Sequence, residues 1–79
     1  MLQLEILSPT GKIFEGEVNS VSLPGSEGSF GVLTNHAPII STLKEGKIEW
    51  TNDKFQKESI HIAGGVVEVL KNRISVLIK

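Results

Sequence analysis

The sequence predicts an all-β fold of short, mostly antiparallel strands, arranged as a flattened β-sandwich or barrel, and three observations support this prediction. Apolar residues recur at every second position in most segments, and nowhere do they keep a period of about 3.6 residues over a helix-length window. Turn-forming residues separate these segments at intervals of roughly 8–12 residues. No helical segment lies between the strands, which argues against parallel βαβ units.

Each predicted strand has one apolar face. In the first strand, Leu2, Leu4 and Ile6 alternate with polar residues. The same alternation defines three further apolar sets, which are Ile48 and Trp50; Ile60 and Ile62; and Ile74, Val76 and Ile78. We expect these side chains to share a single core.

The alternation is interrupted by one irregular segment and by turns. Val18, Val21 and Leu23 fall out of step across Ser20, which predicts a β-bulge that redirects the strand. Turns are expected where Gly, Pro, Asn, Asp and Ser gather, at residues 8–11, 24–28, 34–38, 44–46, 51–54 and 71–72.

Length and charge limit the possible function classes. The 79 residues suffice for one domain, placed at residues 1–79, and such a domain buries only about 60–65% of its unfolded surface, which makes a covering partner plausible. The absence of cysteine excludes disulfides and thiolate sites. A net charge of -1 without a basic cluster argues against nucleic acid as a partner. No apolar run approaches the ~18–20 residues of a membrane span.

The sequence offers no arrangement of catalytic or metal-binding side chains. His36 forms no relay with a neighbour in the sequence, and His61 alternates with Ile60 and Ile62, so it is expected on a solvent-facing side of a strand. We therefore predict no catalytic residue, no metal site and no cofactor. Trp50 and Phe55 are expected to contact each other in the core or across a hairpin.

The glycine-rich segment Gly25–Gly31 is the most unusual feature of the chain. Its glycines would allow positive φ in a tight turn between two strands. A phosphate-binding loop is disfavoured, because the segment matches neither G-x-x-x-x-G-K-[ST] nor G-x-G-x-x-G and no helix follows it. A third interpretation, recognition of a partner, rests on a family resemblance.

Four parts of the sequence carry this resemblance in order along the chain. They are residues 2–9 with 13–16; residues 24–32 with Asn-His-Ala-Pro at 35–38 and Leu-Lys-Glu-Gly at 43–46; residues 62–69; and residues 73–77. Together they resemble the N-terminal β-sandwich of the epsilon subunit of rotary ATP synthases, over essentially the whole chain.

The resemblance implies a flattened sandwich of about ten short strands at the foot of the central stalk. There it would couple the gamma subunit to the c-ring as a non-catalytic rotor subunit of a proton- or sodium-translocating enzyme. It would belong to a peripheral membrane complex on the cytoplasmic face of a bacterial inner membrane, or on the equivalent face of an organelle, and would meet the membrane only through the complex.

The resemblance also assigns contact residues. Those expected to face the c-ring are Ser26, Glu27, Gly28, Ser29, Phe30 and His36, with Glu27 as the partner of a basic or amide side chain. The family often has an acidic residue where this chain has Ser29. Those expected to face the gamma subunit are Pro38, Ile40 and Ser41. Pro38 favours an extended Ala37, which would turn Ile39 and Ile40 to opposite faces, one to the core and one outward.

Two further expectations remain. Most relatives continue into two C-terminal helices that inhibit ATP hydrolysis and in some bind ATP; this sequence ends at Lys79, so no C-terminal helical domain and neither property is transferred to it. The alternative function is a small β-domain that binds a carbohydrate, a peptide or a carrier-type group through the Gly25–Gly31 loop. Lys54 only partly resembles the modified lysine of a biotinyl or lipoyl carrier.

Overall fold

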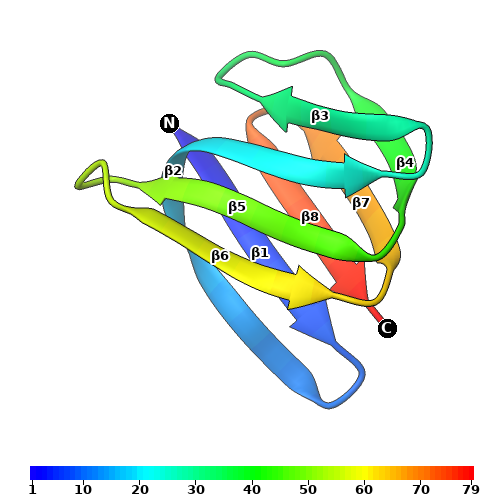
Figure 1. Ribbon diagram of the computed structural model, residues 1–79. Helices are drawn as coiled ribbons and strands as arrows, with labels where there is room; N and C mark the ends of the chain where they lie inside the picture. The colour runs from blue at the N-terminus through cyan, green and yellow to red at the C-terminus, as the bar shows by residue number, and fades with distance from the viewer.

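The computed structural model describes all 79 residues and contains eight β-strands and no helix (Figure 1). The strands are β1 (Leu2–Ser8), β2 (Gly11–Gly25), β3 (Gly28–Val32), β4 (Ile39–Leu43), β5 (Gly46–Asn52), β6 (Lys57–Ile62), β7 (Gly65–Leu70) and β8 (Arg73–Ile78). All strand pairs are antiparallel except β1 with β8. The predicted all-β, mostly antiparallel class is therefore confirmed.

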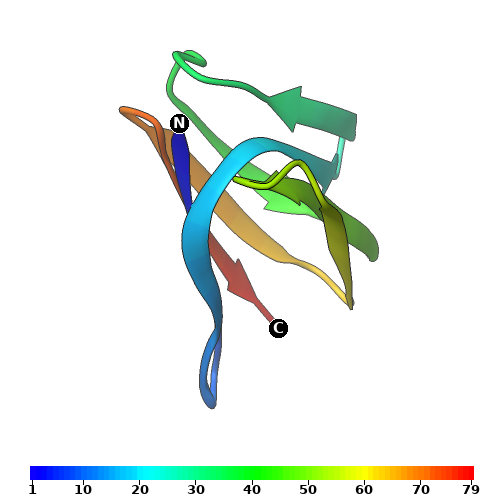
Figure 2. The ribbon, with the colours of Figure 1, turned by 90° about the vertical axis from the view of Figure 1, so that its left-hand side faces the viewer.

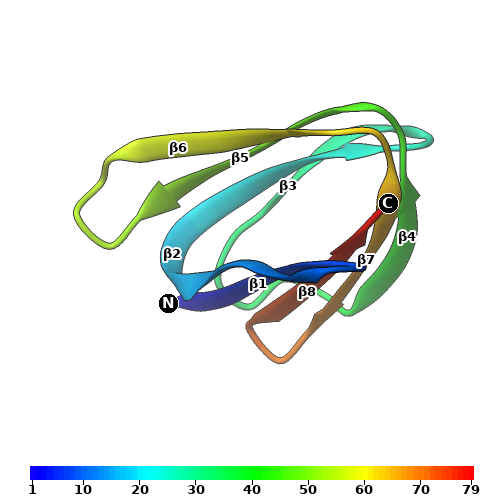
Figure 3. The same cartoon turned by 90° about the horizontal axis from the view of Figure 1, so that it is seen from below.

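The strands form two layers that face each other, as seen from below in Figure 3. One layer contains β1, β8, β7 and β4, and the other contains β5, β6 and β3. The long strand β2 belongs to both, because its first half pairs with β1 and its second half pairs with β3 and β5. Figure 2 shows β2 curving from one layer into the other.

The eight strands are slightly fewer than the expected number of about ten, and β2 accounts for part of the difference. Its 15 residues remain one continuous strand where two shorter strands, one for each layer, could have been counted. The register between β2 and β5 shifts between Val18 and Ser20, as the irregular pattern of this segment predicts. Because this bulge adds one residue, Val18 and Val21 both point inward and the strand bends without ending.

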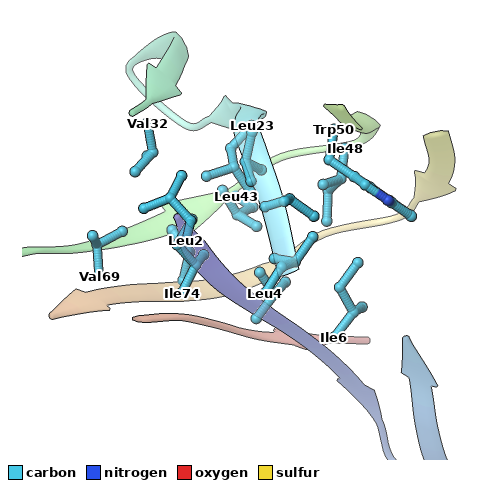
Figure 4. Close-up of a cluster of buried hydrophobic side chains, with 14 of the residues drawn as sticks. Leu2, Leu4, Ile6, Leu23, Val32, Leu43, Ile48, Trp50, Val69 and Ile74 are labelled. Atoms are coloured by element: carbon cyan, nitrogen blue, oxygen red, sulfur yellow. The ribbon is translucent and has the colours of Figure 1, made fainter. Parts of the chain in front are cut away.

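The core lies between the layers and consists of 15 buried hydrophobic residues (Figure 4). Leu2, Leu4 and Ile6 are at most 1% exposed, and Ile62 and Ile74 are at most 2% exposed. The alternation therefore identifies the core faces of β1, β6 and β8 correctly. His61, one residue before Ile62, is exposed as predicted.

The expected contact between Trp50 and Phe55 is wrong. Trp50 packs instead against Phe14 of β2, with ring centroids 4.7 Å apart. Phe55 lies in the turn between β5 and β6 and is 79% exposed, with a φ of 60°. The turn reverses the chain at this residue and directs its side chain away from the core.

Candidate interaction surfaces

The glycine-rich segment forms a tight hairpin between β2 and β3. Gly25 pairs with Gly28, so that Ser26 and Glu27 alone make the turn. Gly28 has a φ of 133°, a conformation that side chains rarely adopt. At Gly25 the limit is space, because an added Cβ would lie 2.6 Å from the Gly28 carbonyl oxygen and 2.8 Å from the Phe30 ring. The tight-turn interpretation of this segment is confirmed.

Hydrogen bonds hold this turn against β4. The Ser26 N–H donates to the Thr42 carbonyl oxygen at 3.0 Å, and Thr42 Oγ1 donates to Ser26 Oγ at 2.8 Å. The Lys44 N–H donates to the Pro24 carbonyl oxygen at 2.9 Å. The exposed Glu27 at the tip forms no ion pair within the chain. The fold thus presents one unpaired carboxylate on a turn fixed by a neighbouring strand.

The six residues expected to face the c-ring fall into two groups. Residues 26–29 are exposed and lie together in the hairpin, with Phe30 half-buried behind them. His36 lies beyond the other end of β3, whose five residues at about 3.3 Å each span ~13 Å between the first and last Cα. His36 is held within its own loop: its N–H donates to the Leu33 carbonyl oxygen at 3.1 Å, and its Nδ1 lies 2.6 Å from the Ala37 carbonyl oxygen.

The three residues expected to face the gamma subunit also fall into two groups. Ile39 packs against the core and Ile40 is 73% exposed, which confirms that these neighbours face opposite sides of β4. Pro38 and Ile40 line a shallow depression of about 390 Å³ together with Leu70. Ile39, Val69 and the charged Glu68, which pairs with Ile40, complete the lining, and Ser41 is not part of it.

The sequence prediction missed an apolar row on the outer face of β7 and β8. Val66 pairs with Leu77, and these side chains are 42% and 58% exposed. Thr42 of β4 pairs with Val66 and therefore extends this row towards Ile40. The signal was present in the sequence: Val66 and Leu77 are apolar at positions that the alternation assigns to solvent. An exposed apolar sheet face of this kind is typical of a contact surface.

The surface of the molecule has few clusters of side chains that could bind a metal ion or a small ligand. No three His, Asp or Glu side chains gather closely enough to hold a metal ion. His61 Nε2 lies 3.8 Å from Glu45 Oε2, and both side chains are exposed. An open depression of about 440 Å³ lies over β2, β3 and β5 and is lined by Ser20, Thr51 and eight other residues. The fold has no helix of the length and apolar character needed to cross a membrane.

One ion pair perturbs two ionisable groups. Lys12 Nζ lies 2.8 Å from Glu15 Oε1 and 3.5 Å from Glu5 Oε2. The hydrogen bond from Lys12 lowers the pKa of Glu15, and the same bond raises the pKa of Lys12. Because the pair is exposed at the β1–β2 hairpin, it marks a solvated surface and gives no sign of a reaction centre.

Fold and surface together describe a small β-sandwich that presents a fixed acidic turn and an apolar sheet face. The chain belongs to the family of ATP synthase delta/epsilon chain β-sandwich domains, whose model matches residues 1–79.

Curated relatives agree with this assignment. The chain is 49% identical to the ATP synthase epsilon chain of a Nitratiruptor species, over 99% of this chain and 60% of that protein. It is 46% identical to the ATP synthase epsilon chain of Campylobacter jejuni subsp. doylei, over 100% of this chain and 61% of that protein. The chain thus spans about 60% of the length of these relatives.

Two cryo-EM structures share the fold. A chain in the Euglena gracilis mitochondrial ATP synthase, described as OSCP/F1/c-ring, superposes with a TM-score of 0.91 at 23% identity, over 98% of this chain and 49% of that one. A chain in the central stalk/c-ring structure of the Tetrahymena thermophila mitochondrial ATP synthase gives 0.78 at 15% identity, over 98% and 62%. At these identities the likeness establishes the fold.

Proposed function

We propose that this chain serves in the central stalk of an ion-translocating ATP synthase, where it joins the gamma subunit to the c-ring and catalyses no reaction. Family membership and relatives named as epsilon chains support this role. Solved structures of the same fold come from assemblies whose descriptions include the c-ring. The chain would then be peripheral on the cytoplasmic face of a bacterial membrane, or the equivalent face of an organelle, with no nucleic-acid partner.

One observation carries the proposal, the hydrogen-bonded link between the β2–β3 turn and β4. The turn offers Glu27 to the c-ring, while β4 offers Ile40, with Pro38 just before it, to the gamma subunit. Ser26 and Thr42 join these elements by two hydrogen bonds. Transmission of torque between the two partner surfaces needs such a connection. Closely packed, hydrogen-bonded elements transmit a displacement with little deformation.

The apolar character of one surface and the charge of the other suit these two roles. Ile40 lines the shallow depression beside Leu70, and Val66 and Leu77 form a second apolar area on the same sheet, separated from the first by Glu68 and Ser75. A partner that covers this area would bury apolar surface and supply stability that a small core lacks. Glu27 would add a directional polar contact at the β2–β3 turn.

The experiment is a pull-down of the tagged chain with the gamma subunit of its own organism, with and without the c-ring. We expect a defined complex with the gamma subunit that also retains the c-ring. Ile40→Asp should weaken retention of the gamma subunit, because it places a charge in an apolar contact. Ser59→Asp, at an exposed position of β6 in the other layer, is the matched control and should bind normally.

Failure of the folded wild-type chain to bind either partner would reject the proposed function. The alternative binding module would then be tested at the Gly25–Gly31 hairpin. Equal loss of binding in Ile40→Asp and Ser59→Asp would instead reject the assignment of the gamma-facing surface.

A further inference from the structure

Two asparagines that lie far apart in the sequence meet at the end of the sandwich. Asn35 belongs to the loop of residues 33–38 between β3 and β4, and Asn72 belongs to the turn between β7 and β8. The Asn35 N–H donates to Asn72 Oδ1 at 2.6 Å, and Asn72 Nδ2 donates to Asn35 Oδ1 at 3.4 Å. These two hydrogen bonds are called the Asn35–Asn72 clasp below.

The clasp is the sole hydrogen-bonded tether of the 33–38 loop to another part of the chain. The other bonds of the loop, from the His36 N–H to Leu33 and between His36 Nδ1 and Ala37, stay inside it. Asn72 itself is well fixed, because its carbonyl oxygen accepts the Gln3 N–H at 2.9 Å. The clasp therefore ties a loop with few contacts to a turn that is bonded to β1.

The backbone of both residues supports a specific use of asparagine. Asn35 has a φ of 66° and Asn72 a φ of 62°, in the left-handed region that glycine adopts most easily. A requirement for positive φ alone would be met by glycine at both positions. Asparagine tolerates the same conformation and adds an amide that can bond across the gap. In each residue the side chain makes the bond that glycine would lack.

We propose that Asn72 is a positioning residue: through the clasp it fixes the loop that carries His36, and so holds His36 in one orientation for the c-ring contact that the family resemblance assigns to it. This inference rests on the proposed function. Asn72 does not itself touch the partner. Its effect passes through Asn35 to the adjacent His36, whose loop would otherwise be held only at its two strand ends.

The matched variants follow from the backbone geometry. Asn72→Gly retains the favoured φ and removes only the side-chain amide. Lys71→Gly is the control, since Lys71 has a φ of 51° in the same turn and makes no side-chain hydrogen bond. In the isolated chain, Asn72→Gly should speed hydrogen exchange at the Asn35 amide roughly 5- to 10-fold, the worth of about one hydrogen bond. Lys71→Gly should leave that rate unchanged.

Binding to the assembled gamma subunit and c-ring then tests the positioning role. Asn72→Gly should weaken binding roughly threefold or more, and His36→Ala should cost less affinity in the Asn72→Gly background than in the wild type, because coupled residues are not additive. Unchanged Asn35 exchange in Asn72→Gly, or additive effects of Asn72→Gly and His36→Ala, would overturn the proposal. Wild-type chain that fails to bind the assembly at all would instead reject the proposed function.

Discussion

Two hairpin tips of this molecule differ in what holds them. The β2–β3 turn is small, contains Ser26 and Glu27, and is bonded to β4. The β5–β6 tip is larger and is bonded to itself: Asn52 Oδ1 accepts the Lys54 N–H at 2.8 Å and the Gln56 N–H at 3.0 Å. Asn52 itself is bonded to β2, because its carbonyl oxygen accepts Asn19 Nδ2 at 2.8 Å, but the hydrogen bonds of residues 54–56 all go to Asn52. The first tip is thus bonded to a second strand at the turn itself, and the second tip only at its base.

This difference predicts which tip can transmit force from a bound partner to the rest of the molecule. Force applied to Glu27 passes through Ser26 to β4, and β4 is paired with β7 over its whole length. Force applied to Phe55 passes first to Asn52 of its own hairpin and reaches β2 only from there. A rigid loop is therefore not sufficient for coupling. The hydrogen bonds between the loop and a second element determine whether the loop can transmit force.

The largest expected effect concerns the base of the β5–β6 hairpin. Ile62→Ala should lower the free energy of unfolding by about 2–5 kcal/mol, because Ile62 is 2% exposed and its truncation leaves a cavity. Urea unfolding monitored by circular dichroism measures this. A change of only a few tenths would mean that this hairpin is loosely held at its base as well as at its tip.

The next effect concerns the base of the β2–β3 turn. Gly25→Ala should destabilise the chain by about 1–3 kcal/mol, because its Cβ would overlap the Gly28 carbonyl oxygen and the Phe30 ring. The control is Gly31→Ala, whose added Cβ has only one neighbour, at 3.8 Å. Equal stability of the two variants would contradict the tight packing assigned to the turn.

Reversal of charge at the two tips separates binding from stability. Glu27→Lys should weaken attachment to the c-ring roughly 3- to 10-fold and leave the unfolding midpoint unchanged, because an exposed turn residue contributes to contact and little to the core. Lys54→Glu at the other tip should change neither. Unfolding of Glu27→Lys would argue for a structural role of this residue, and loss of binding in Lys54→Glu would break the distinction between the tips.

The smallest expected effect is at Phe55. Its φ of 60° is unfavourable for an aromatic residue, and its side chain is 79% exposed. Phe55→Gly should therefore change stability by less than about 1 kcal/mol, in the stabilising direction, because relief of backbone strain outweighs the greater freedom of the unfolded chain. A marked loss of stability would show that the Phe55 ring supports the hairpin.

The sequence predicted those features that depend on local periodicity. Burial of alternate residues in β1 and β8, the bulge after Val18 and the tight turn at Gly25–Gly28 all follow from side-chain alternation and glycine chemistry. The opposite orientation of Ile39 and Ile40 follows from the same rule.

Features that depend on contacts between distant segments were not predictable in the same way. The partner of Trp50 is Phe14, far away in the sequence, and the alternation within a strand does not identify a partner on another strand. The separation of His36 from the Glu27 turn depends on the length and direction of β3. The Asn35–Asn72 clasp joins two loops whose proximity only the strand order creates.

The most direct test of the central claim compares the two tips within the assembled ATP synthase. A photo-crosslinking amino acid is placed at position 27 in one variant and at position 54 in another, and crosslinked products are identified by mass spectrometry. We expect crosslinks to the c subunit from position 27 and none from position 54. Crosslinks to the c subunit from position 54 alone would contradict this expectation.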